Sequence, residues 1–196
     1  MKQRRAAVER NTKETRIRVD LCLDGQGRCA VRTGLPFLNH MLELLTRHAL
    51  WDLRLEAAGD LEVDYHHTVE DVGLALGTAL DRALGERRGI RRYGAAAVPM
   101  DEALSEAVVD LGGRPYLVKE MACRKRRVLQ FDLALLDDFL RAFVTQARMN
   151  LHIDQRRGAE AHHAWESAFK ALARALRTAC EIDPRERGVP SSKGRI

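Results

Sequence analysis

His66-His67-Thr68-Val69-Glu70-Asp71 opens one apolar-periodic segment of this chain, and Ala161-His162-His163-Ala164-Trp165-Glu166-Ser167 opens another in the second half. Both stretches read His-His-x-x-Glu. Imidazole and carboxylate groups in the same order at the heads of two helical segments indicate matching sets of metal ligands. We therefore expect fold and function to be organised around a duplicated pattern.

Helical geometry decides which of these side chains can share one ion. With about 3.6 residues per turn, His66 faces the same side as Glu70, and His162 the same side as Glu166. The second histidine of each pair is rotated by roughly 100° and points elsewhere. We therefore predict two metal sites, each with His and Glu from one helix and a further histidine from elsewhere. In the alternative interpretation, the histidines are solvated residues of a helix N-terminus and each glutamate is a capping partner.

The donor types narrow the choice of ion. Imidazole combined with carboxylate suits Mn, Fe, Zn, Co or Ni better than Ca or Mg. Neither stretch contains a thiolate, which argues against a structural zinc site of the cysteine-rich type. The cysteines are widely spaced, without a Cys-x-x-Cys motif, and are expected to be reduced thiols.

Composition bounds the class of protein. The 196 residues are 45% hydrophobic, enough for a substantial core, and we expect a soluble, cytoplasmic protein. The basic N-terminal stretch, residues 1–8, precedes no apolar leader, and no run approaches the ~18 apolar residues of a membrane span. The net charge of +5 is mixed with many acids and aromatic residues make up only 5%, so neither a nucleic-acid nor a membrane partner is expected. A minority of the basic residues is available for an anionic small substrate.

Apolar spacing predicts the elements of the first half. The expected elements are strands at 16–23, 28–33 and 51–57 and helices at 37–48 and 68–84. Asp24–Gly27 is expected to be a hairpin turn between the first two strands. The helix at 37–48 is apolar nearly all round, so we expect it to be sandwiched between other layers. Residues 87–94 link the halves.

The second half repeats this order of elements. The expected elements are strands at 95–98, 103–110, 115–119 and 149–154 and helices at 135–146 and 161–180, with 126–131 either a short strand or a loop. Alternation places His152 on the opposite strand face from Leu151 and Ile153. The tail after residue 183 has no periodicity, and its length alone favours a frayed end.

Three single residues are ambiguous from local pattern. Glu14 precedes a strand, where a lone glutamate is usually a surface residue. His40 lies within the helix at 37–48, where a hydrogen-bonded core histidine and a metal ligand are equally good interpretations. His48, near the end of the same helix, is interpreted as structural because a cation is favoured there.

Taken together, the motifs resemble those of the imidazoleglycerol-phosphate dehydratase family of histidine biosynthesis. The matching segments are, in order, Thr12–Thr15, Phe37–Leu42, Gly59–Leu61, His66–Asp71, Arg92–Gly94, Asp110–Tyr116, Leu151–Ile153, His162–Glu166 and Pro190–Gly194. The resemblance implies an α+β fold made of two duplicated, two-layer halves like the second domain of ribosomal protein S5, each a mixed sheet with two helices and a left-handed crossover. We accordingly place the repeats at 1–92 and 93–183, followed by a substrate-binding tail at 184–196.

The resemblance also implies an activity. Members of the family remove water from D-erythro-imidazoleglycerol phosphate to give imidazoleacetol phosphate. The implied reaction passes through a metal-bound imidazolate, with two Mn²⁺ per active site. The implied assembly is a homo-oligomer of 24 subunits whose active sites are shared between neighbours.

The resemblance assigns roles to particular residues. One implied metal set is His66, Glu70, His152 and His163, and the other is His40, His67, His162 and Glu166. The histidines outside the two i, i+4 pairs could be exchanged between these sets. Glu14 is the implied acid/base, and Glu166 is expected to be catalytic as well as a ligand. The implied substrate and phosphate contacts are Glu14, Arg92, Arg114, Ser191, Ser192 and Lys193.

Departures from the family and rival functions bear on this assignment. Asn39 and Tyr65 stand where the family often has Asp, and Glu160 where it usually has Asn. A carboxylate hydrogen-bonded to a ligand imidazole fixes its tautomer and raises its basicity, so these departures put the metal affinity and the pH profile in doubt. One rival function is a dinuclear metallohydrolase, for which an Asp-rich ligand set would be typical. The other is a metal-storage or assembly protein, which would give no role to Glu14.

Overall fold

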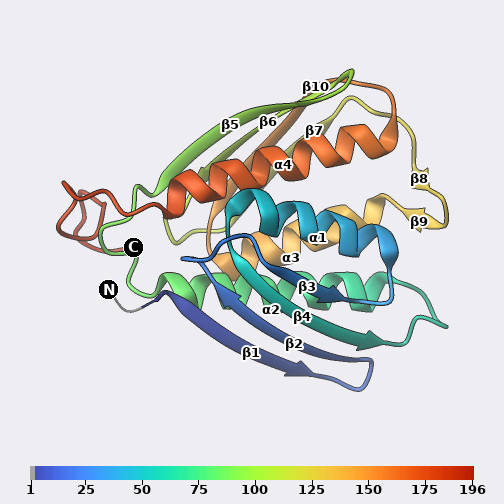
Figure 1. The fold of residues 1–196 in the computed structure, drawn as a ribbon, viewed down its shortest axis with the longest axis horizontal. Helices are drawn as coiled ribbons and strands as arrows, with labels where there is room; N and C mark the ends of the chain where they lie inside the picture. Colours follow the sequence, from blue (N-terminus) through green and yellow to red (C-terminus); the bar gives the residue numbers. More distant parts are fainter. Residues whose placement is uncertain (1–2) are drawn as a thin grey trace.

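The first half contains a four-stranded sheet and two helices (Figure 1). The computed structural model describes residues 3–196, so the first two residues of the basic N-terminal stretch lie outside it. The elements are β1 (Arg5–Asn11), β2 (Thr15–Cys22), β3 (Cys29–Arg32), α1 (Pro36–Ala49), β4 (Asp52–Gly59) and α2 (His66–Leu84). The strand order is β1-β2-β4-β3, in which β3 and β4 are parallel and the other neighbours antiparallel.

The second half repeats this arrangement. Its elements are β5 (Tyr93–Met100), β6 (Ala103–Asp110), β7 (Tyr116–Met121), β8 (Arg127–Val128), β9 (Phe131–Asp132), α3 (Ala134–Ala147), β10 (Asn150–Arg157) and α4 (Ala161–Cys180). The order β5-β6-β10-β7 matches the first sheet strand by strand, and β7 with β10 is again the parallel pair. The small β8–β9 hairpin is inserted before α3. The expected α+β fold with an internal duplication is therefore confirmed.

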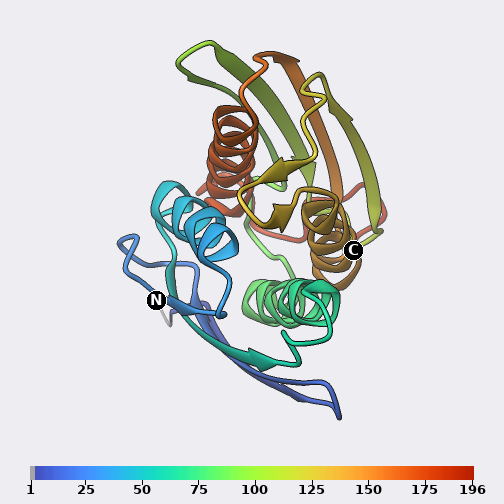
Figure 2. The ribbon, with the colours of Figure 1, turned by 90° about the vertical axis from the view of Figure 1, so that its right-hand side faces the viewer.

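The four helices lie between the two sheets (Figure 2). Each half has two layers, and the halves meet helix to helix, α2 on α3 and α1 on α4. A Cβ atom on Gly73 would lie 2.6 Å from the carbonyl oxygen of Phe139, so glycine permits the close approach of α2 and α3. The apolar helix at 37–48 corresponds to α1, which contacts both β3 and α4, and the sandwiched position expected for it is confirmed.

All four helices begin at the same end of the molecule, which is on the right in Figure 1. We call this the histidine end, because His66-His67 and His162-His163 lie in the first turns of α2 and α4, and His40 lies directly after the first turn of α1. The opposite end, where residues 181–196 lie, is called the tail end (Figure 1). Both His-His stretches are therefore brought to one end by the parallel course of the helices.

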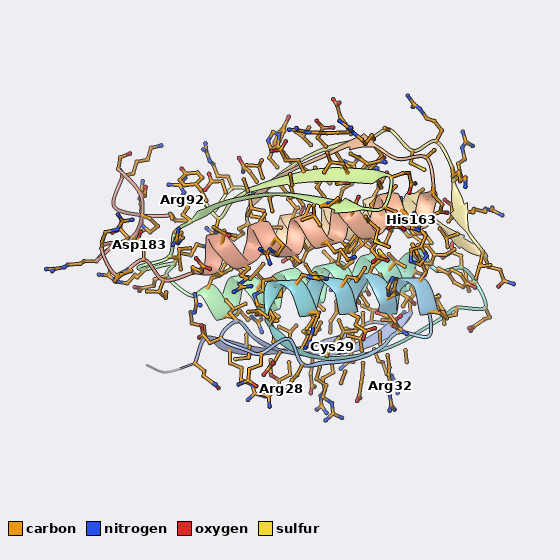
Figure 3. The ribbon with its side chains drawn as sticks, turned by 45° about the horizontal axis from the view of Figure 1, so that its top comes forward. Arg28, Cys29, Arg32, Arg92, His163 and Asp183 are labelled. Carbon is orange, nitrogen blue, oxygen red and sulfur yellow. The ribbon has the colours of Figure 1, made fainter. Side chains whose placement is uncertain are left out.

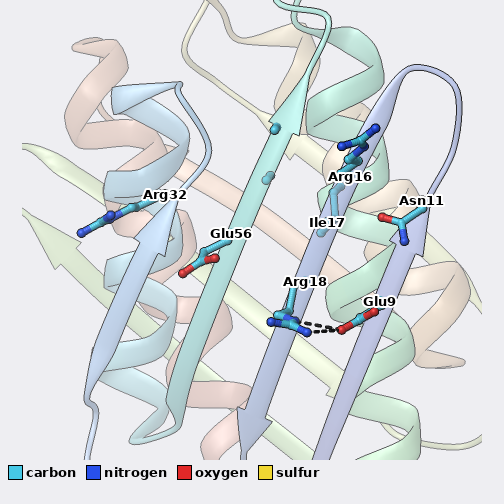
Figure 4. A pocket seen from close by; sticks show the side chains of 9 residues that line it. Glu9, Asn11, Arg16, Ile17, Arg18, Arg32 and Glu56 are labelled. Atoms are coloured by element: carbon cyan, nitrogen blue, oxygen red, sulfur yellow. Dashed lines mark hydrogen bonds and ion pairs between the residues drawn. The ribbon is translucent and has the colours of Figure 1, made fainter.

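The outer faces of the two sheets differ in chemistry. Across the first sheet, a row of alternating charge runs from Arg32 through Glu56 and Arg18 to Glu9, and Arg18 and Glu9 form an ion pair at 2.5 Å (Figure 4). The second sheet instead exposes large apolar side chains, among them those of Val108, Tyr93 and Tyr116, which are 43%, 57% and 64% exposed to solvent. The first face is suited to water, whereas the second retains apolar surface that a partner could cover.

The hairpin expected between residues 16–23 and 28–33 is wrong. β4 lies between β2 and β3, and β2 forms its hairpin with β1, a strand that sequence analysis did not predict. The Asp24–Gly27 turn lies against the start of β4, where the Asp52 carboxylate accepts hydrogen bonds from the backbone of Gln26 (2.8 Å) and Arg28 (3.0 Å). Of the residues of β1 only Val8 is buried, so this edge strand has almost no apolar alternation to detect.

Candidate active site

Three predicted ligands meet where the two halves join. His40 of α1 and His162 of α4 bring their Nε2 atoms to 3.2 Å, and the Oε2 atom of Glu166 lies 3.1 Å from each. Although burial of the Glu166 carboxyl opposes ionisation, hydrogen bonds from Lys170 and His40 lower its pKa to about 2. The cluster therefore offers two imidazole nitrogens and a charged carboxylate in positions that could hold a metal ion.

Lys170 is a site residue that sequence analysis missed. Its ammonium group lies 2.6 Å from Oε1 of Glu166, one helical turn away on α4. The i, i+4 spacing from Glu166 was the available signal. Lys170 thus holds the carboxylate oxygen that does not face the two histidines.

Glu14 and His67 form a second group at the histidine end. The Oε2 atom of Glu14, in the turn between β1 and β2, lies 3.9 Å from Nε2 of His67 on α2. The other ring nitrogen of His67 lies 3.0 Å from Asp60. This hydrogen bond to Asp60, which outweighs burial, raises the pKa of His67, and the charge on Glu14 adds to the effect.

A carboxylate lies near Nδ1 of three of the candidate histidines. Asp60 lies 3.0 Å from Nδ1 of His67, and Glu102 lies 2.8 Å from Nδ1 of His163. Asp138 of α3 lies 3.3 Å from Nδ1 of His66. A carboxylate at Nδ1 fixes the tautomer and leaves Nε2 free for a metal. These partners lie far from their histidines in the sequence or in an irregular turn, and no local pattern would have identified them.

The three departures from the family do not contact the ligand rings in this way. Asn39 accepts hydrogen bonds from the backbone and hydroxyl of Thr33, Tyr65 stacks on Phe131, and Glu160 caps α4 through the backbone of His163. Asp60, Glu102 and Asp138 provide carboxylates to the rings instead. His66, His67 and His163 therefore have carboxylate partners at Nδ1 despite these departures.

A largely apolar cavity of about 530 Å³ adjoins the cluster. His40 and His162 line it together with Phe37, Tyr65 and Phe131. The β8–β9 hairpin contributes the outer wall, including Leu129, which is 95% exposed. A small planar ring could approach the cluster from this side.

The remaining predicted ligands are separated within one chain. His163 and His66 lie at the histidine end with their carboxylate partners, whereas His152 points outward from the second sheet, between Val108 of β6 and Val118 of β7. Its expected face is confirmed. In the predicted set of His40, His67, His162 and Glu166, three members are in contact and His67 lies apart from them. The other predicted set, with His66, Glu70, His152 and His163, does not converge within one chain.

The predicted phosphate contacts lie at the tail end. The Arg92 guanidinium pairs with Asp110 at 2.7 Å and donates to the carbonyl oxygen of Pro190, which holds the tail in place. Ser191 and Lys193 follow in a turn, where Ser191 Oγ accepts from the backbone of Lys193. The tail expected to be frayed from its length is thus tied to the linker. Figure 3 shows Arg92 and Asp183 at one end of the molecule and His163 at the other.

A family model and proteins of similar sequence all point to one enzyme family. A family model for imidazoleglycerol-phosphate dehydratase matches residues 33–176. A protein of that name from Acidithiobacillus ferrooxidans is 52% identical, with 100% of this chain and 99% of that protein covered. Another from Thioalkalivibrio sulfidiphilus is 53% identical, with 100% of both covered.

Solved structures of the same family have the same fold. The imidazoleglycerol-phosphate dehydratase of Staphylococcus aureus matches with a TM-score of 0.83 and 38% identity, covering 91% of this chain and 99% of that chain. The enzyme from Pyrococcus furiosus, in complex with (S)-C348, matches with a TM-score of 0.84 and 35% identity, covering 96% of this chain and 100% of that chain.

The fold and the site define an internally duplicated α+β enzyme with a candidate metal centre between its halves. The chain belongs to the imidazoleglycerol-phosphate dehydratase family, and it is accordingly a hydro-lyase of histidine biosynthesis that acts on a small molecule. Within residues 3–196, no helix has the length and apolar character needed to span a membrane.

Proposed function

We propose that this chain dehydrates D-erythro-imidazoleglycerol phosphate to imidazoleacetol phosphate in a manganese-dependent reaction. The observation that carries the proposal is the convergence of His40, His162 and Glu166 at the junction of the halves. This cluster lies beside a cavity that can admit an imidazole ring. Membership of the family supplies the overall reaction.

Two Mn²⁺ ions per active site are part of the proposal. His40, His67, His162 and Glu166 would hold one, and His66, Glu70, His152 and His163 the other. Borderline nitrogen donors mixed with carboxylate fit a first-row divalent ion. When bound, the ions would supply Lewis acidity that stabilises the deprotonated imidazole ring and so favours departure of the neighbouring hydroxyl.

Glu14 is proposed to move the proton in this reaction. The hydroxyl leaves the carbon next to the ring, a proton is removed from the adjacent carbon, and the resulting enol becomes the ketone by protonation at the ring-side carbon. Glu14 is half exposed and lies beside His67, so its carboxylate can reach a ligand bound at the histidine end. Glu166, held by Lys170, is proposed to orient the substrate as well as bind metal.

A complete site is proposed to need more than one copy of the chain. Arg92 donates its backbone N–H to Ala179, at the end of α4, while His162 lies at the start of that helix. With a rise of about 1.5 Å per residue, the two positions are roughly 25 Å apart, too far for one phosphorylated substrate to bridge. Phosphate contacts from Arg92, Arg114, Ser191, Ser192 and Lys193 would therefore come from a neighbouring subunit.

The outer face of the second sheet supports association. It carries His152 beside exposed Val108, so a partner docking there would cover apolar surface and gain a histidine ligand. We propose a homo-oligomer of 24 subunits, located in the cytoplasm, as in the family assembly described above.

The decisive experiment is turnover of imidazoleglycerol phosphate by the purified protein loaded with Mn(II). Formation of the enol and keto product, followed by absorbance, is expected together with a metal requirement. Release of inorganic phosphate should be absent, because a metallohydrolase and not a dehydratase would produce it. No dehydration by protein with a full metal complement would refute the proposal.

A further inference from the structure

A buried carboxylate connects α2 to the turn that carries Glu14. Asp71, 5% exposed, accepts a hydrogen bond from Oγ1 of Thr15 at 2.5 Å and another from Nε of Arg10 at 2.8 Å. Thr15 itself is only 2% exposed. Asp71 of α2 is therefore joined to the start of β2, directly after the β1–β2 turn, through a buried hydroxyl.

The hydrogen bonds within the turn have a defined direction. Oγ1 of Thr12 accepts from the backbone N–H groups of Glu14 (3.1 Å) and Thr15 (2.9 Å). The Thr12 and Thr15 hydroxyl oxygens are 3.2 Å apart. Since the single Thr15 hydroxyl proton goes to Asp71, Thr12 must donate to Thr15. A continuous chain thus runs from Asp71 through Thr15 and Thr12 to the backbone of Glu14.

Close packing also holds the start of α2 against the strands β2 and β4. Thr15 stands opposite Gly59 in the sheet, and a Cβ atom on Gly59 would lie 2.0 Å from the hydroxyl oxygen of Thr68 in the first turn of α2. That oxygen is buried and, within residues 3–196, has no hydrogen-bond partner. The start of α2 therefore packs closely against the start of β2 and the end of β4, which leaves little freedom for the β1–β2 turn to shift.

We propose that Asp71 and Thr15 are positioning residues that fix the Glu14 carboxylate relative to the metal-binding face of α2. The inference rests on the proposed function of Glu14. The hairpin does not need this link to close, because the Thr12 N–H already bonds the Thr15 carbonyl oxygen and the β1–β2 ladder precedes it. What the link adds is a fixed distance between Glu14 and His67, which lies on the same helix as Asp71.

Substitution of the hydroxyl tests the link at constant side-chain size. Thr15→Val should lower kcat about tenfold or more, because misplacement of a proton-transfer group is costly, while KM and bound Mn(II) change less than about twofold. Thr15→Ser should restore kcat to within about threefold of wild type, because the hydroxyl is returned. Thr46→Val is the matched control, since it removes a buried hydroxyl of α1 that donates to the carbonyl oxygen of Leu42 at 2.7 Å and takes no part in the β1–β2 turn.

Two further measurements separate positioning from general damage. In a Glu14→Gln background, Thr15→Val should change the residual kcat by less than about twofold, because residues that act through one group are not additive. Hydrogen exchange at residues 10–16 should accelerate in Thr15→Val and stay unchanged in Thr46→Val.

The outcomes distinguish this inference from the proposed function. Absence of turnover in the wild-type protein would refute the function, whereas an active wild type, an inactive Glu14→Gln and a fully active Thr15→Val would refute only the positioning role. A Thr15→Val effect that persists undiminished in the Glu14→Gln background, or that tracks loss of metal, would also overturn it.

Discussion

The Nε2 atom of His40 lies 3.2 Å from the Nε2 atom of His162, although the two residues belong to different halves of the duplicated fold. Glu166 completes the group at 3.1 Å from both. Lone pairs that converge this closely are stabilised by a cation between them. Metal binding is thereby expected to join the halves as well as to serve the reaction.

Removal of His40 should reduce metal binding without unfolding α1. We expect His40→Ala to bind less Mn(II) per chain in elemental analysis and to lose the rise in Tm that added Mn(II) gives the wild type. His48→Ala is the matched control, because His48 lies about two turns further along the same helix and is not one of the three residues of the cluster. Equal metal content in the two variants would contradict the site. His66→Ala and His162→Ala should each lower metal content and also disturb assembly.

The carboxylates at Nδ1 should control metal affinity. Asp60→Asn and Glu102→Gln are each expected to weaken Mn(II) binding by about 10–100-fold, because the histidine loses a partner that orients the ring and raises its basicity. Affinity measured by competition with a chelator checks this. Glu43→Gln, an exposed acid of α1, should bind Mn(II) as the wild type does; a similar loss in all three variants would show only a nonspecific charge effect.

The duplication and the types of ligand could be predicted because both are visible in short stretches of neighbouring residues. His-His-x-x-Glu is read from neighbouring residues, and the apolar period of α2 and α4 places the motif at helix N-termini. The pairing of strands was not predictable in the same way, because β4 lies between β2 and β3 and its Asp52 holds the Asp24–Gly27 turn from a distant part of the sequence.

The site residues likewise fall into those that local sequence indicates and those that only tertiary contacts bring together. The approach of His40 to His162 required the resemblance to a known family, since nothing near either residue indicates the other. Glu102 and Asp138 are brought to their histidines by tertiary packing alone. Lys170 is the exception, because its spacing from Glu166 could have been noticed.

A site shared between subunits predicts complementation between inactive variants. His162→Ala damages the histidine end and Arg92→Ala damages the tail end, so each alone should be inactive. In assemblies made by co-expression of both, random mixing gives about a quarter of the sites an intact histidine end from one chain and an intact tail end from another. Activity near that fraction of wild type is expected after tandem purification on two different tags.

The control for complementation is a pair of variants that damage the same end. His162→Ala mixed with His40→Ala should restore far less, because both substitutions fall in the cluster supplied by one chain. Failure of the first mixture to exceed the second would refute a site divided between the histidine end of one subunit and the tail end of another.

Asp52 should make stability depend on acid pH. Hydrogen bonds from Arg28, which outweigh burial, and from the backbone of Gln26 hold the Asp52 pKa well below its ordinary 3.8. A depressed pKa in the folded state means that this stabilisation is fully present above the ordinary value and is lost as pH falls below it. At neutral pH we expect Asp52→Asn to lower the free energy of unfolding by about 1 kcal/mol, because the lost hydrogen bonds are charged but solvent reaches the Arg28–Asp52 pair. Denaturant titrations at fixed protein concentration should show the difference from wild type narrowing as the pH is lowered below 3.8, whereas Glu62→Gln, at an exposed position, should match wild type throughout. A difference that stayed constant or widened in acid would show that the Asp52 charge does not hold this loop.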